Sequence, residues 1–275
     1  MSTPTLLGAS SQLMMKPVTQ ALRTNAGFQL EEDTRPNITQ QLRDQSLSAA
    51  LLSPLDYARD SSALCIIPDV AVVSRQTDSS IIIPFREGVK TIRTLAVDPA
   101  YASEIVLAKI ILAESFDIEP RIVPIAAPFD VMMQKADAAL LVGDQPFHAQ
   151  YNSDRYIDIV EEWCVMTELP YVHAVWCGRE SDLSKEDIMH IQNAAFKGVA
   201  GIGDIALEYP PEERSAVQHY LESFSYELTD EAREGLAEFM KYLYYHGILP
   251  DVAELNFYKT ADEEKDDLLS DISSN

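Results

Sequence analysis

The sequence predicts an α/β protein whose sheet is mainly parallel. Short apolar or β-branched runs, typical of buried strands, alternate with segments that carry apolar residues at helical spacing. Proline, Ser, Thr or Asp precedes several of these segments and glycine follows some of them, as at the starts and ends of helices. With 275 residues, 47% of them hydrophobic, the chain can bury a sizeable core as one large domain or two small ones.

Strands are expected where apolar or β-branched residues run together between turn-forming residues. The clearest is residues 80–85, which contain three consecutive isoleucines. In chain order, the expected strands are residues 5–9, 47–52, 63–68, 70–74, 80–85, 94–97, 121–125, 138–142 and 171–176.

Helices are expected where a start signal precedes apolar residues at helical spacing. Pro17 opens the first helix and Gly27 closes it. Ser184 and Asp187 have the spacing of a capping box. In chain order, the expected helices are residues 17–26, 39–45, 53–60, 98–116, 129–135, 154–167, 184–197, 211–223 and 229–246. The acidic, serine-rich residues 259–275 are expected to form a disordered tail.

Charge and composition exclude several kinds of partner. The chain has 44 acidic and 21 basic residues, a formal net charge of −23, so we expect neither nucleic acid nor a membrane surface as a partner. No apolar run is long enough to span a bilayer, and residues 1–10 do not resemble a secretory signal. Cys65, Cys164 and Cys177 form neither a disulfide framework nor a metal-binding pair, so a cytoplasmic location is expected.

The motif content argues against metal and nucleotide chemistry. The five histidines show neither HExxH nor HxxxH spacing, and the chain has no P-loop, GxGxxG or GxSxG motif. We therefore expect neither a metal site nor a nucleotide-binding loop. His148 is a weak ligand candidate because it follows a predicted strand end, whereas packing explains His173 and a helix-end position explains His246.

Polar residues gather where predicted strands end and helices begin. Ligands of open α/β sheets bind at the carboxyl ends of the strands, and hydroxyls with free helix N–H groups can bind small anions there. Taken singly, each serine is also explained as a helix cap or turn residue. The polar residues at these corners are Ser10, Ser11, Gln12, Ser53, Ser79, Ser80, Asp98, Tyr101, Ser103 and Asp144.

Four stretches resemble the chorismate dehydratase family of the futalosine route to menaquinone. They are residues 48–59, residues 95–114, residues 136–144 together with 162–163 and 167–176, and residues 220–249. The likeness runs in order over roughly residues 45–258. The resemblance implies a periplasmic-binding-protein-like type II fold with a ligand cleft between two lobes. By this analogy, lobe 1 spans residues 1–85 plus 178–258 and lobe 2 spans residues 86–177.

The resemblance also implies a reaction. The family removes water from chorismate to give 3-[(1-carboxyvinyl)oxy]benzoate, a carbon–oxygen hydro-lyase reaction that needs no cofactor. Such a cleft must hold a small carboxylate substrate, orient it and move one proton, and aromatisation supplies the driving force. The substrate-binding residues that we expect are Ser11, Gln12, Ser53, Ser80, Tyr101, Ser103 and Asp144.

The cleft positions depart from the family pattern more than the scaffold does. Met14 stands where the family has an asparagine that is thought to matter for the chemistry, and Gln12 stands at a tyrosine. Ala102 replaces an arginine and Glu104 a serine near the start of the helix expected over residues 98–116, and Pro54 replaces the second serine of a pair. A glutamate beside a dianionic ligand would add repulsion unless it points away, and Gln12 or Lys16 could compensate. The catalytic residues remain open.

These departures leave two functional hypotheses. The chain is a chorismate dehydratase or a close relative that acts on another cyclic carboxylic acid, or it is a diverged paralogue that binds a small carboxylate without dehydrating it. A third and weaker hypothesis makes Glu104 a general base. Its position at a helix start favours the ionised form, which makes it a poor base.

Overall fold

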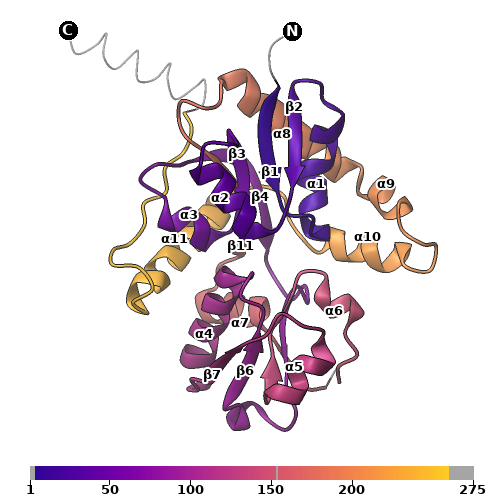
Figure 1. The fold of residues 1–275 in the computed structure, drawn as a ribbon, viewed down its shortest axis with the longest axis vertical. Coiled ribbons are helices and arrows are strands. Elements are labelled where there is room, and N and C mark those ends of the chain that lie inside the picture. The colour runs from indigo at the N-terminus through magenta and orange to yellow at the C-terminus, as the bar shows by residue number, and fades with distance from the viewer. Residues whose placement is uncertain (1–3, 153, 260–275) are drawn as a thin grey trace.

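Two α/β lobes stack end to end in the computed structural model, which describes residues 4–152 and 154–259 (Figure 1). The first lobe is built on a five-stranded sheet in the order β2-β1-β3-β11-β4. Its strands are β1 (Thr5–Ala9), β2 (Phe28–Glu32), β3 (Ala49–Leu52), β4 (Cys65–Ser74) and β11 (Tyr171–Gly178). The expected tail falls almost wholly on residues 260–275, outside the described residues.

Helices cover both faces of this sheet, which explains why its strands read as continuous apolar runs. In β3, Ala50 and Leu52 pack with one cluster and Ala49 and Leu51 with another. The first cluster includes α2 (Arg35–Arg43), α3 (Pro54–Arg59) and α11 (Asp230–Tyr245). The second includes α1 (Lys16–Thr19), α8 (Lys185–Ala200), α9 (Ile202–Leu207) and α10 (Arg214–Glu222).

The second lobe holds two three-stranded sheets. The parallel sheet β7-β6-β8 joins β7 (Arg121–Pro124), β6 (Thr94–Val97) and β8 (Ala138–Ala139). The antiparallel sheet β10-β5-β9 joins β10 (Tyr156–Asp158), β5 (Ile81–Pro84) and β9 (Leu141–Val142). The helices of this lobe are α4 (Ala102–Phe116), α5 (Phe129–Lys135), α6 (Gln145–His148) and α7 (Ile159–Thr167).

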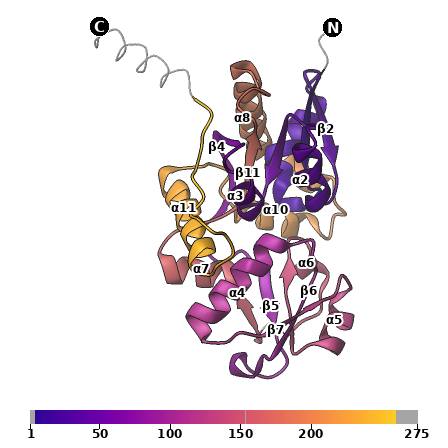
Figure 2. The ribbon, with the colours of Figure 1, turned by 60° about the vertical axis from the view of Figure 1, so that its left-hand side comes forward.

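The chain passes between the lobes twice, from β4 to β5 and from α7 to β11 (Figure 2). Strand pairing places residues 81–84 with the second lobe and 171–178 with the first. The sheets therefore divide the chain a few residues earlier than the expected boundaries at 85 and 177. A division into domains at residues 74–81 and 167–171 is our proposal from this pairing.

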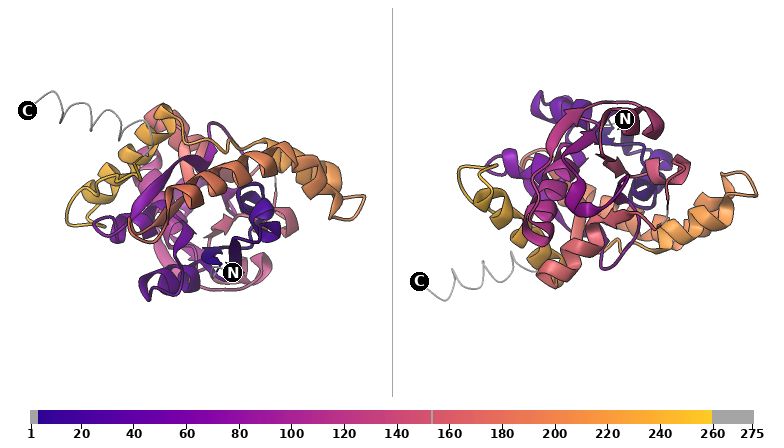
Figure 3. Two further views of the ribbon diagram at one scale, coloured as in Figure 1. Left: turned by 90° about the horizontal axis from the view of Figure 1, so that it is seen from above. Right: turned by 90° about the horizontal axis from the view of Figure 1, so that it is seen from below.

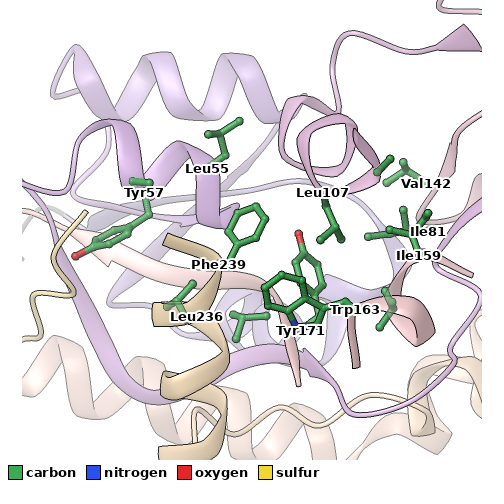
Figure 4. Packing of buried hydrophobic residues seen from close by; sticks show 14 of the residues in the cluster. Leu55, Tyr57, Ile81, Leu107, Val142, Ile159, Trp163, Tyr171, Leu236 and Phe239 are labelled. Atoms are coloured by element: carbon green, nitrogen blue, oxygen red, sulfur yellow. The ribbon is translucent and has the colours of Figure 1, made fainter. Parts of the chain in front are cut away.

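One hydrophobic cluster continues across the junction. Leu236 and Phe239 of α11 pack with Trp163 of α7 and Leu107 of α4, and Tyr171 lies among them (Figure 4). The Trp163 ring meets those of Tyr171 and Phe239 edge-on, at centroid distances of 6.0 and 5.9 Å. The lobes are thus joined by apolar packing on the side where α11 lies. In the views along the long axis, α11 lies at the edge of the molecule, at the left of both pictures (Figure 3).

The α/β class and most elements agree with the sequence predictions, but the expectation of a mainly parallel arrangement is wrong. The sheet β10-β5-β9 is antiparallel throughout, and β11 runs antiparallel to both of its neighbours. The strands β5 and β11 follow the two crossings, so each enters its sheet from the other lobe, which reverses its direction relative to the local strands. The hydrophobic periodicity of a sequence does not indicate whether a strand pairs parallel or antiparallel to its neighbours.

Several boundaries also differ. The helix expected over residues 154–167 begins only at Ile159, because residues 156–158 form β10 and Asp158 caps the helix. The strand expected over residues 138–142 is divided between two sheets, whereas the pieces 63–68 and 70–74 form one strand. The expected helix 17–26 is a short α-helix flanked by 3₁₀ turns. Elements without a prediction are β2, α6 and α9.

Candidate ligand site between the lobes

The loop after β1 meets the end of β9 where the two lobes adjoin. The backbone N–H of Leu13 donates to both carboxylate oxygens of Asp144, at 3.0 and 3.2 Å. Gly143 has φ of +65°, and a Cβ there would collide with Nε2 of Gln12. A side chain is therefore excluded at position 143 both by backbone conformation and by the Gln12 amide from the other lobe.

A buried ion pair joins the lobes beside this contact. Arg35, the first residue of α2, donates through Nη1 to Oε1 of Glu104 in the first turn of α4. The Arg35 side chain is 10% exposed and that of Glu104 only 1% exposed. Burial lowers the pKa of Arg35, but the charge and hydrogen bond of Glu104 outweigh it, so the guanidinium stays charged.

Arg35 also gathers residues of both lobes around its planar group. Its Nε donates to Oε1 of Gln12 at 2.9 Å, and its Nη2 donates to the same oxygen. The guanidinium carbon lies 5.5 Å from the centroid of the Tyr101 ring. Sequence reasoning missed Arg35, because it stands in a stretch with no predicted element and 69 residues from its ion-pair partner.

Asp56 adds a second carboxylate near this pair. Its Oδ2 accepts a hydrogen bond from the Ser53 hydroxyl at 2.6 Å, while Ser53 caps α3 by accepting from the Asp56 N–H. Burial raises the pKa of Asp56, and the Glu104 charge adds to that rise, whereas the Ser53 hydrogen bond and the charges of Arg35 and Arg59 oppose it. Asp56 therefore lies near charges of both signs.

Five buried side chains around the junction each keep a polar atom without a hydrogen-bond partner among the described residues. They come from both lobes and from the start of β11, and they are Gln12 Nε2, Ser80 Oγ, Ser103 Oγ, Glu104 Oε2 and Tyr171 Oη. Burial, and secondarily the Glu104 charge, raises the pKa of the Tyr171 phenol. Ser103 lies close enough to affect that pKa, although the two hydroxyls do not reach hydrogen-bond geometry. Buried polar groups are normally paired, so this concentration indicates a place for a ligand or ordered water.

The predicted site residues are not all brought together. Gln12, Ser80, Ser103 and Asp144 lie at the junction, and Tyr101 lies beside Arg35. Ser53 is a buried helix cap that reaches the site through Asp56, whereas Ser11 is exposed. Asp98 is half-buried and accepts from the Ala100 N–H, in the turn before α4.

The structure also shows the surroundings of Met14, the residue aligned with the family asparagine. Met14 is fully buried in the apolar cluster of the first lobe, with Leu7, Val18 and Trp176. Gln12, two residues earlier, places an amide at the junction instead. Lys16 is engaged elsewhere, with Glu208 at 3.2 Å and the Tyr209 ring at 4.7 Å.

A polar cluster at the first crossing was also missed. The Nε2 of His173 lies 2.9 Å from the Ser74 hydroxyl and 3.3 Å from Oδ2 of Asp78, and Ser74 donates to Asp78. All three are buried. Burial raises the pKa of Asp78, but His173, Ser74 and Ser80 together lower it by more. Because the serine and the aspartate share one ring nitrogen, this is not the relay of a hydrolase triad, and it ties β4 and β11 to the crossing.

The described part of the chain holds neither a cluster of metal-binding side chains nor a helix suited to span a membrane. No three His, Cys, Asp or Glu side chains of residues 4–152 and 154–259 are grouped to hold a metal ion. No helix within those residues is both long and apolar enough to span a membrane.

A cavity of about 250 Å³ opens beside the junction, lined by residues that include Leu13, Asp144, Phe147 and Tyr209.

Comparison with known proteins gives one family and one fold. The sequence profile of a family described as "Menaquinone biosynthesis" matches residues 5–245. A chorismate dehydratase from Thermus thermophilus is 23% identical over 264 residues, which cover 87% of this chain and 95% of that protein.

Two solved structures share the fold at 10% identity. The CA3427 gene product of Candida albicans, described as having the generic periplasmic binding protein fold, has a TM-score of 0.63 and covers 94% of this chain and 98% of its own. The alkanesulfonate-binding protein SsuA from Xanthomonas axonopodis pv. citri, bound to MOPS, has a TM-score of 0.62 and covers 92% and 96%. The two-lobed periplasmic-binding-protein-like fold expected from the sequence is confirmed.

Proposed function

The chain belongs to the menaquinone biosynthesis family, and from this premise we propose that it is a chorismate dehydratase. The reaction would release water from chorismate and leave 3-[(1-carboxyvinyl)oxy]benzoate. One C–H and one C–O bond break, the ring becomes aromatic, and the proton leaves with the hydroxyl as water. No bound group is needed to balance this step.

The observation that carries the proposal is the set of unpartnered buried polar atoms at the junction. Gln12 Nε2 can only donate and Glu104 Oε2, when ionised, can only accept, while the hydroxyls of Ser80, Ser103 and Tyr171 can do either. A ligand that satisfies them must carry both acceptors and a hydroxyl. Chorismate has two carboxylates, an ether oxygen and one hydroxyl.

The site would act mainly by orientation and by excluding water. The Gln12 amide is fixed by Arg35 at its oxygen, so its N–H₂ group has a defined direction. Ser103 and Tyr171 come from different lobes, so closing the lobes brings their hydroxyls to the same ligand. Holding the departing hydroxyl and the acidic C–H in one geometry removes most of the entropic barrier to elimination.

Relatives support the same class of ligand. The relative from Thermus thermophilus is named for chorismate, and the structural neighbour SsuA is named for alkanesulfonates, which are small anions. We propose that the ligand of this chain is a small anionic carboxylate. We also propose that the protein acts in the cytoplasm.

The second hypothesis is a binding protein without the chemistry, and one observation favours it. The positive charge of Arg35 is already matched by Glu104, and Asp56 lies nearby, which disfavours a dianion at this position. A neutral or singly charged ligand would suffer less repulsion.

Incubation of the purified full chain with chorismate tests both hypotheses. We expect a product lighter by one water that absorbs as a substituted benzoate and forms faster than without protein. We expect Gln12→Leu to slow its formation at least about 100-fold, as the loss of an orienting hydrogen bond does in other sites. The exposed Gln29→Leu is the matched control and should keep the wild-type rate. Unchanged chorismate, with binding detected by calorimetry, would establish the binding protein instead.

A further inference from the structure

The role of the Arg35–Glu104 pair goes beyond holding the lobes together. We propose that the Glu104 carboxylate occupies the carboxylate-binding position of Arg35, and that a carboxylate of the ligand takes its place there. Glu104 is then an internal competitor of the substrate. This inference rests on the proposed carboxylate ligand, but not on whether that ligand is dehydrated.

Arg35 has the properties of a carboxylate anchor. Its side chain is only 10% exposed, it lies where residues of both lobes meet, and its orientation is fixed by two hydrogen bonds to Gln12 and by the Tyr101 ring. A guanidinium carries five N–H donors in a plane that matches a carboxylate, and three of them bind Gln12 and Glu104. Among the described cationic side chains, it is the one that contacts Gln12, Tyr101 and Glu104 at the junction.

Glu104 has fewer hydrogen-bond partners than Arg35 has. One of its oxygens binds Arg35, but Oε2 is buried and has no hydrogen-bond partner among the described residues. A buried carboxylate with an unsatisfied oxygen loses much of the hydration that it had in water. A ligand carboxylate that satisfied both oxygens, through Arg35 and the free Gln12 N–H, would bind the guanidinium better than Glu104 does.

The charge balance favours exchange over addition. Glu104 already matches the charge of Arg35, so a ligand carboxylate added beside the intact pair would be repelled by the Glu104 carboxylate without a free cation to bind. If Glu104 leaves Arg35, a ligand carboxylate can form an ion pair with the guanidinium in its place. The glutamate that seemed incompatible with an anionic ligand thus becomes its stand-in when the site is empty.

Chemical rescue tests the exchange without chorismate. Glu104→Ala should leave Arg35 without its carboxylate and lower the melting temperature, and added acetate should restore stability in a saturable way. Sodium chloride at equal ionic strength should not. The wild type, whose own glutamate fills the position, should respond to acetate no more than to chloride. The double variant Arg35→Gln/Glu104→Ala should likewise show no acetate effect beyond chloride.

Binding of chorismate to Glu104→Gln is the second measurement and keeps the test open if the alanine variant does not fold. Removing the competing charge should lower the Kd for chorismate at least about 10-fold by calorimetry, and Arg35→Gln should raise it by a similar factor. An acetate effect that matches chloride in Glu104→Ala, or unchanged or weaker chorismate binding by Glu104→Gln, would overturn the exchange. Failure of dehydration alone would leave acetate rescue intact, so it would count only against the proposed reaction.

Discussion

At the scale of single residues, Gln12 and Met14 show that an amide absent from one position can be present two residues earlier. The resemblance aligns position 14 with an asparagine, yet Met14 has no exposed surface and packs in the apolar core of the first lobe. Gln12 provides the amide at the junction, oriented by Arg35. A substitution at an aligned position therefore does not by itself show that a functional group has been lost.

Restoring the family residue at position 14 should damage the fold instead of improving the site. We expect Met14→Asn to lower the free energy of unfolding by about 2–4 kcal/mol, because it places an unpaired amide in an apolar cluster and leaves part of the methionine volume empty. The exposed Met189→Asn is the control and should cost less than about 1 kcal/mol. Urea denaturation measures both. A stable Met14→Asn variant with faster chorismate turnover would show that position 14 faces the ligand.

At the scale of elements, the second lobe is attached to the first crossing through the start of α7. Asp158 accepts from Val160 and Glu161 N–H at 3.0 and 3.1 Å, which caps the helix. It also accepts from the Thr77 hydroxyl at 2.6 Å and the Ser79 N–H at 3.0 Å. One carboxylate thus fixes both the helix start and the crossing that leads to Ser80.

Asp158→Ala should therefore cost more than the loss of an ordinary helix cap. We expect about 3 kcal/mol of unfolding free energy, because buried N–H groups of two elements lose their acceptor together. Ser184→Ala, which removes the exposed cap of α8, should cost about 1 kcal/mol. The comparison uses thermal and urea unfolding of both variants. Equal losses would mean that the crossing does not depend on Asp158.

At the scale of the whole molecule, the lobes meet in two chemically different ways. On the side of α11, the contact is apolar and continuous, through Trp163 and Phe239. On the side of the β1 loop, it consists of hydrogen bonds, in which Leu13 donates to Asp144 and the Tyr220 hydroxyl donates to the Gly143 carbonyl at 3.3 Å. Polar contacts exchange readily with water and apolar ones do not, so we expect the lobes to open on the β1 side.

Gly143→Ala tests how closely the lobes must approach. Its matched control is Gly247→Ala, since Gly247 has φ of +66° but open space around its Cα. Both variants should show the cost of a left-handed alanine, about 1–2 kcal/mol. Only Gly143→Ala should also weaken chorismate binding and raise the radius of gyration in small-angle X-ray scattering, because its Cβ collides with Gln12. Identical behaviour of the two variants would mean that closure does not depend on this contact.

The sequence by itself determined the α/β class, most helices and strands, the family and several of the polar residues that lie at the junction. It could do so because periodicity, capping residues and the ends of strands are local signals, and Gln12, Ser80, Ser103 and Asp144 all follow or precede them. Only the tertiary structure decided the strand directions, the burial of Met14 and the pairing of Arg35 with Glu104. These depend on contacts between residues far apart in the chain, such as the 69 positions between Arg35 and Glu104, and no local pattern records them. The charges that meet at the junction are fixed by how the two lobes pack.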